Sequence, residues 1–190
     1  MLEVSGKKAD NIQSSLFFIF MEAKTLLNSV SYYSFIKSNS GWNEIDNLKF
    51  FKKYPHFLSA TIMSLRHQII VDIAKLFDND HKTINLEKLF NQCEQTKRDD
   101  LKELLYKYKK TFNIYRNELN DYIKTARDKI YAHIDYSFNV SKTDKYDEFM
   151  LEKSVLERII EFLKWILNVC IELSVKYDGD LTCLRIMMIC

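Results

Sequence analysis

The sequence predicts an all-α protein, an antiparallel up-and-down bundle of four long helices with one or two short ones. Its 190 residues include only three glycines and one proline, too few for the turns of an all-β or doubly wound α/β fold. Apolar residues recur at three- and four-residue steps, which is the spacing of one helix face. A hydrophobic content of 47% suffices for one core and excludes global disorder.

The first predicted helix begins at a cap supplied by Asp10 or Asn11 and ends near Ile36. Its seam consists of apolar residues in register: Ile12, Leu16, Ile19, Phe20, Ala23, Leu27 and Val30. Three further apolar side chains widen this seam and indicate burial on two sides: Phe17, Phe18 and Met21. Residues 38–43 are rich in Ser, Asn and Gly and are predicted to form a loop.

Two more helices are predicted before residue 96. Pro55 suits the first turn of a helix, where its missing N–H leaves no bond unmade. The polar stretch 77–82 ends that helix, and Asn85 can cap a short helix that reaches about Gln95. The stretch that precedes Pro55 is assigned no element.

The second half of the chain contains two long predicted helices. The first covers about residues 98–133 and either continues or kinks at residues 117–120. Residues 137–148 are polar and predict a loop. The last helix covers about residues 151–177, because apolar side chains stay in register throughout.

We expect a single domain over residues 1–190, with its core in about residues 10–177. Gly179 fits the C-terminal stop of the last helix. Residues 178–190 then form a short apolar tail, which could close on the core or contact a partner.

Charge and cysteine content narrow the function classes. A net charge of +2 gives no global basic field, so DNA is not expected and any polyanion site must be local. The four cysteines lie far apart with no C-x-x-C pattern (Cys93, Cys170, Cys183 and Cys190). We therefore expect no disulfide framework and no cysteine metal site. The phosphate-binding pattern G-x-x-x-x-G-K-[ST] and the zinc pattern H-E-x-x-H are absent from the sequence, so no metal or other cofactor is expected. The apolar runs are too short for a signal core or a bilayer span, so we expect a cytoplasmic location and no membrane partner.

One cluster could carry chemistry, the run RDKIYAHID at residues 127–135. Arg127 can hold a phosphate by two parallel N–H bonds. His133 can move protons at neutral pH, and Asp128 can orient either side chain. The three form a workable set for cleaving RNA through its 2′-hydroxyl, with Arg127 stabilising charge on the phosphate.

Helix geometry leaves a second interpretation open. Positions 127 and 133 are six residues apart and therefore point about 120° away from each other. His133 shares a face with Ala126, Lys129 and Ile130, so it could simply pack beside the core while Arg127 faces water.

The same residues resemble the HEPN superfamily, and within it the abortive-infection U-type HEPN-like proteins. The signature of that superfamily is Arg-x(4–6)-His with a polar residue after the arginine, which Arg127, Asp128 and His133 satisfy. The run RDKIYAHID resembles the local form of this group, and residues 64–78 (SLRHQIIVDIAKLFD) resemble its upstream helix. The resemblance extends over about residues 10–177.

The resemblance implies a homodimer whose two motif helices meet at one cleft. In active relatives such a cleft is a metal-independent endoribonuclease, often a toxin in phage defence or in a toxin–antitoxin pair. Arg127, Asp128 and His133 would be catalytic. Five secondary candidates would contact RNA: Lys124, Lys129, Tyr131, Asp135 and Tyr136.

One departure concerns the antitoxin partner. Relatives that pair with a nucleotidyltransferase antitoxin carry tyrosine two residues after the histidine, whereas Asp135 holds that place here and Tyr136 follows it. This difference argues against transfer of the antitoxin's modification to this chain. Many HEPN-like proteins also keep the fold without nuclease activity, so two functions stay open, an RNA-cleaving enzyme and a catalytically silent helical dimer that binds RNA or a protein.

Overall fold

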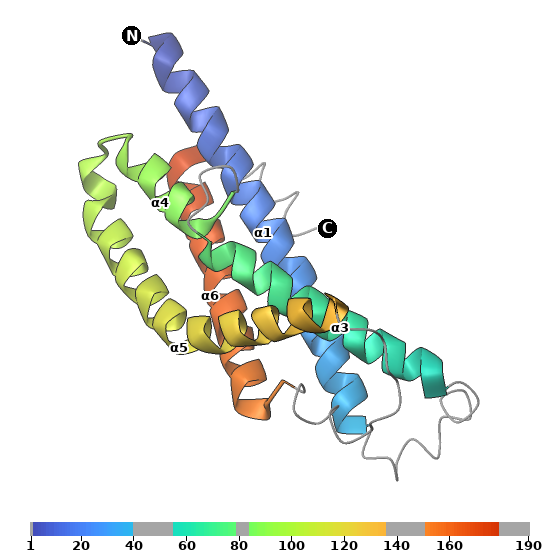
Figure 1. The fold of residues 1–190 in the computed structure, drawn as a ribbon. Coiled ribbons are helices and arrows are strands. Elements are labelled where there is room, and N and C mark those ends of the chain that lie inside the picture. The colour runs from blue at the N-terminus through green and yellow to red at the C-terminus, as the bar shows by residue number, and fades with distance from the viewer. Residues whose placement is uncertain (1, 40–54, 79–83, 136–150, 179–190) are drawn as a thin grey trace.

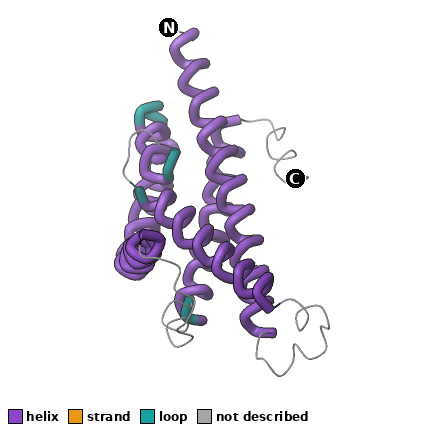
Figure 2. The backbone as a smooth tube through the Cα atoms, turned by 45° about the vertical axis from the view of Figure 1, so that its right-hand side comes forward, coloured by secondary structure: helices purple, strands orange, loops and turns teal. Residues whose placement is uncertain are grey.

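The computed structural model describes residues 2–39, 55–78, 84–135 and 151–178, and these are helical nearly throughout (Figure 1). The elements are α1 (Leu2–Asn39), α3 (Pro55–Phe77), α4 (Leu86–Glu94), the 3₁₀ turn η2 (Asp99–Leu101), α5 (Lys102–Asp135) and α6 (Lys153–Asp178). No strand occurs in these ranges (Figure 2). The predicted all-α bundle of four long helices with short additions is confirmed.

The long helices alternate in direction. In Figure 1, α1 runs downward, α3 upward, α5 downward and α6 upward. α1 packs along α6 and against α3, while α5 lies on α3 and also contacts α4 and α6. This arrangement places the end of α3 beside the second half of α5.

A cluster of aromatic rings joins four helices at the centre of the core. The ring of Phe77 in α3 stacks on that of Phe162 in α6 with centroids 4.9 Å apart. Phe112 of α5 lies 6.4 Å from Phe162 and 6.1 Å from Phe90 of α4. All four side chains are buried, and each such aromatic pair adds about 0.5–1.5 kcal/mol beyond the area it buries.

The start of α1 corrects the sequence prediction. The helix begins at Leu2, so Asp10 and Asn11 lie inside it and do not cap it. A glycine inside a helix, such as Gly6 here, costs only about 1 kcal/mol, and extending an existing helix is far easier than starting one. Phe18 is 56% exposed, so burial on two sides is wrong for that side chain.

The predicted starts of α3 and α4 are confirmed. α3 begins at Pro55, and α4 follows Asn85, whose side chain accepts a hydrogen bond from the N–H of Lys88 at 2.8 Å. Lys97 adopts a positive φ of 54° and ends the turn between α4 and η2.

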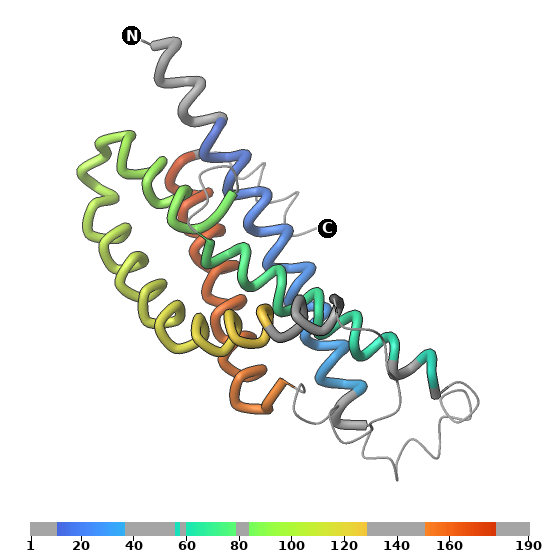
Figure 3. The backbone as a smooth tube through the Cα atoms, in the orientation of Figure 1, coloured from blue at the N-terminus to red at the C-terminus, as the bar shows by residue number. Residues whose placement is uncertain are grey.

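The structure shows α5 as one continuous helix, which was one of the two predicted alternatives. Its helical hydrogen bonding is unbroken from Lys102 to Asp135, yet the ribbon changes direction in its yellow part (Figures 1 and 3). The segment contains neither glycine nor proline, so the helix bends around the core without breaking.

The predicted loop at 38–43 begins too early, because α1 continues to Asn39. Residues 40–43, the predicted loop at 137–148, the stop at Gly179 and nearly all of the apolar tail lie outside the described residues. The single-domain boundaries therefore stay a prediction. None of the described helices has a stretch that is long and apolar enough to cross a membrane.

Candidate functional site

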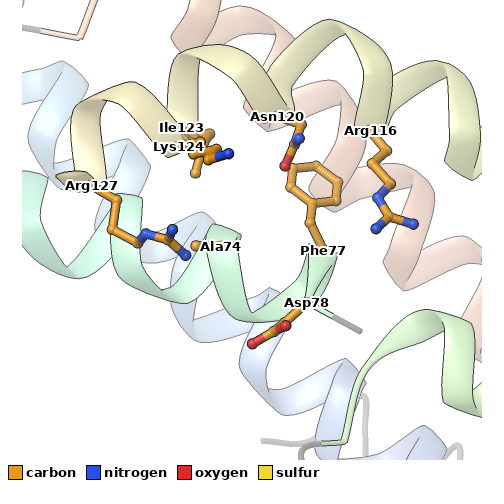
Figure 4. Close-up of a pocket in the computed structure, with 8 residues that line it drawn as sticks. All are labelled: Ala74, Phe77, Asp78, Arg116, Asn120, Ile123, Lys124 and Arg127. Atoms are coloured by element: carbon orange, nitrogen blue, oxygen red, sulfur yellow. The ribbon is translucent and has the colours of Figure 1, made fainter. Parts of the chain in front are cut away.

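Arg127 lies on α5 and lines a concave site between that helix and the end of α3 (Figure 4). We call this site the cationic groove; its volume is about 210 Å³. It is lined by eight residues: Ala74, Phe77, Asp78, Arg116, Asn120, Ile123, Lys124 and Arg127. The side chain of Arg127 is 40% exposed, so a solute can reach it.

The groove has an apolar floor and a charged rim. Phe77 and Ile123 are buried core residues, which fixes the floor. Among the lining residues, three cations stand against the single carboxylate of Asp78. Glu87 and Asp128, outside the lining, each pair with one of these cations, so an anion that enters the groove competes with carboxylates for the guanidinium groups.

Two of the cations have carboxylate neighbours. Nη1 of Arg116 donates to Oε2 of Glu87 in α4 at 3.3 Å. Nε and Nη2 of Arg127 donate to Oδ1 of Asp128 at 3.3 and 3.2 Å. Because these pairs are long and partly exposed, they contribute only about 0–1 kcal/mol, and a phosphate can compete for the guanidinium.

The remaining predicted site residues are described less fully. Lys124 is exposed and lines the groove. Positions 129, 131, 133 and 135 belong to the helical backbone of α5, but the side chains there lie outside the description, as does Tyr136. The structure thus brings Lys124, Arg127 and Asp128 together and leaves the chemistry of His133 a prediction.

Sequence reasoning missed two groove residues on the motif helix, Arg116 and Asn120. Their spacing from Lys124 and Arg127 in the sequence could have identified them. These four residues fall at steps of four, four and three, which repeat one face of a helix. The groove residues at the end of α3, by contrast, could not be predicted from spacing along α5.

Polar side chains from three helices lie close together where α1, α3 and α5 meet. The hydroxyl of Tyr33 in α1 accepts the N–H of Leu151 at 3.2 Å. Burial lowers the pKa of Arg66 in α3, and burial raises the pKa values of Tyr33 and Tyr122, the latter in α5. Arg66 interacts electrostatically with both tyrosines, so α1, α3 and α5 meet in one polar cluster.

Metal ligands do not gather in the part of the chain that the structure describes. No group of three His, Cys, Asp or Glu side chains there is placed to hold an ion.

Comparison with known proteins identifies the family. No curated protein and no solved structure matched the chain. The AbiU2 family of HEPN proteins matches residues 41–184, a region that contains both segments lining the groove and begins after α1. The match covers 144 of 190 residues, so the predicted resemblance is confirmed, and the chain belongs to the AbiU2 family of HEPN-like abortive-infection proteins.

Proposed function

We propose that this protein is a metal-independent endoribonuclease of HEPN type that acts as a toxin in phage defence or in a toxin–antitoxin pair. One observation carries the proposal. The two segments that resemble the family, residues 64–78 and 127–135, are far apart in sequence, and Ala74, Phe77, Asp78 and Arg127 from these segments line one groove. Residues of one functional site must lie together in space, whereas two helix faces with no shared function need not line one groove.

Arg127 is the group that binds the scissile phosphate. Its guanidinium is permanently charged, reachable from solvent and part of a cationic rim. Planar N–H donors match phosphate oxygens two at a time. Asp128 accepts from the same guanidinium and holds it in place until RNA arrives.

His133 is the proton carrier, supplied from a second copy of the chain. Because α5 is continuous to Asp135, positions 127 and 133 are about 120° apart around its axis. One helix therefore does not direct both residues at one phosphate. A two-fold axis between the motif helices would place Arg127 of each copy near His133 of the other.

The reaction needs no cofactor. One His133 takes the proton of the 2′-hydroxyl, whose oxygen then bonds to phosphorus. The bond from phosphorus to the 5′ oxygen breaks, and the other His133 protonates that leaving oxygen. Arg127 stabilises the charge on the phosphate oxygens, and the products are a 2′,3′-cyclic phosphate and a 5′-hydroxyl.

Cleavage of cellular RNA in the cytoplasm would arrest growth and so limit the spread of a phage. A toxin of this kind needs restraint before infection, for which the proposal includes an antitoxin protein.

The test uses the purified full chain with RNA in the presence of EDTA. We expect cleavage that leaves cyclic-phosphate ends, a loss of about 10²–10⁴-fold in His133→Ala and of about 10²–10³-fold in Arg127→Ala. Lys107→Ala is a matched control, because Lys107 is also exposed on α5 and does not line the groove.

Two outcomes would contradict the proposal of a HEPN-type nuclease. One is wild-type cleavage that survives in His133→Ala, and the other is RNA binding by the wild type with no cleavage at all. The latter favours the catalytically silent helical module.

A further inference from the structure

We infer that the cationic groove binds the RNA strand beside the cleaved phosphate, with Arg116, Asn120 and Lys124 holding the strand. The inference rests on the proposed function and extends it, since these three residues lie outside the HEPN motif. It assigns a substrate-binding track along α5 that leads away from Arg127.

The alignment of the residues supports a track. Arg116 and Arg127 are eleven residues apart, and at about 100° per residue they differ by only about 20° around the helix. At about 1.5 Å per residue they are about 16 Å apart along it. Figure 4 shows Asn120 and Lys124 between them on the same side of the helix. A site of this length suits successive groups of a polymer better than one phosphate.

The chemistry of the lining suits a nucleic-acid backbone. Lys124 and Arg116 can pair with phosphates, and the amide of Asn120 can donate to phosphate or sugar oxygens. The floor is formed by apolar side chains that are buried in the core, Phe77 and Ile123. It offers no hydrogen-bond partner to a base edge, so we expect binding with little sequence preference.

The volume argues against a small molecule as the occupant. Pockets that enclose drug-sized ligands measure about 300–1,000 Å³, whereas the cationic groove measures about 210 Å³. A single strand needs only to cross the groove with its phosphates against the rim.

The pair of Arg116 with Glu87 can yield to an RNA phosphate. Its bond to Glu87 is long at 3.3 Å, and the side chain of Glu87 is 44% exposed. An exposed pair of this kind is weak, so an RNA phosphate can share or replace the carboxylate.

The experiment measures binding separately from cleavage. The full chain is titrated with a short uridine oligonucleotide whose 2′-O-methyl groups prevent cleavage, and fluorescence anisotropy is recorded at several salt concentrations. The groove variants are Lys124→Gln, Asn120→Ala and Arg116→Gln.

Lys107→Gln serves as the matched control for binding. Lys107 is nine residues before Arg116 and thus about 180° away around α5, so it removes the same charge from the opposite face. Circular dichroism on each variant verifies the fold, and Lys124→Arg restores the charge at a groove position.

We expect Lys124→Gln and Arg116→Gln each to weaken binding about fivefold at 0.1 M salt. The loss of one phosphate contact with a single strand reduces the slope of log binding constant against log salt concentration by about 0.7, which corresponds to about fivefold at 0.1 M salt. Asn120→Ala should weaken binding and leave the slope unchanged. Lys107→Gln should bind as the wild type does, and Lys124→Arg should recover the affinity.

The groove assignment falls if the wild type does not bind the oligonucleotide, or if the groove variants bind no worse than Lys107→Gln. Failure of the proposed nuclease is a different result. A chain that binds through the groove and never cleaves unmodified RNA would refute the nuclease and keep the groove. A chain that cleaves RNA while its groove variants bind normally would keep the nuclease and refute the groove.

Discussion

Asn85 controls the start of α4 through one side chain. It has extended backbone angles, φ −137° and ψ 169°, and its side chain accepts the N–H of Lys88. The residue is only 2% exposed, so water cannot replace its hydrogen bonds.

We therefore expect Asn85→Ala to lower the free energy of unfolding by about 1–2 kcal/mol, the upper part of the range for lost caps. Urea denaturation measures the change. Asn113→Ala is the control, because Asn113 is exposed within α5 and alanine favours a helix interior. Equal losses in both variants would show that the cap contributes nothing.

The buried thiols give the protein a pH dependence of its stability. Cys93 and Cys170 are buried; burial raises the pKa of Cys93 from 9.0 to about 11 and raises the pKa of Cys170 as well. The pKa of Tyr177 shifts in the same direction, because burial raises it from 10.0 to about 12.

A group whose pKa is raised by folding binds its proton more tightly in the folded chain. Its contribution to the free energy of unfolding is complete below its ordinary pKa and is lost as the pH rises through its pKa in the folded chain. We expect the free energy of unfolding to fall as the pH rises from 9 to about 11, and to fall less steeply in Cys93→Ala. Urea titrations at each pH measure this. A curve of Cys93→Ala parallel to that of the wild type would contradict the assignment to Cys93.

At the scale of the element, α6 depends on the rings that it presents to its neighbours. Phe162 is fully buried, stacks on Phe77 at 4.9 Å and lies 5.2 Å from Tyr115. Its ring thus joins α6 to α3 and to α5, directly below the floor of the cationic groove.

Removing that ring should leave a cavity that the helices cannot fill. We expect Phe162→Ala to lower the free energy of unfolding by about 3–5 kcal/mol. Phe18→Ala should change it by no more than about 0.5 kcal/mol, since Phe18 is 56% exposed. Denaturation of the two variants side by side tests the difference, and similar losses would refute the packing argument.

Some helix boundaries can be predicted from neighbouring residues in the sequence, and others cannot. The cap at Asn85 and the start at Pro55 depend on neighbouring residues only, and both were predicted. The start of α1 was predicted wrongly, because polar residues such as Asp10 can cap a helix but can equally lie within one. The sequence left open whether α5 continues or kinks at residues 117–120, and the structure shows a continuous helix that bends.

At the scale of the whole molecule, the proposed chemistry requires two chains. A cleft that takes Arg127 from one copy and His133 from the other has a consequence that a site within one chain does not share. Because His133 of both copies acts in that cleft, one defective copy disables the whole dimer.

We expect an equal mixture of wild type and His133→Ala, unfolded and refolded together, to cleave RNA at about one quarter of the rate of the same amount of wild type, because about one quarter of the dimers then hold two intact copies. Light scattering with size exclusion should show a dimer for both chains. A rate of about one half would argue that each copy cleaves by itself, and a monomer at working concentration would refute the shared cleft.

The sequence by itself determined the fold class, the boundaries of α3 and α4, and the family, because periodicity, caps and short motifs are encoded within a few neighbouring residues. Only the tertiary structure decided that the end of α3 faces Arg127 across the groove and that Phe18 stays exposed. These features depend on how surfaces from distant segments pack against each other. Such packing minimises voids across the whole core, so no local stretch of sequence specifies it.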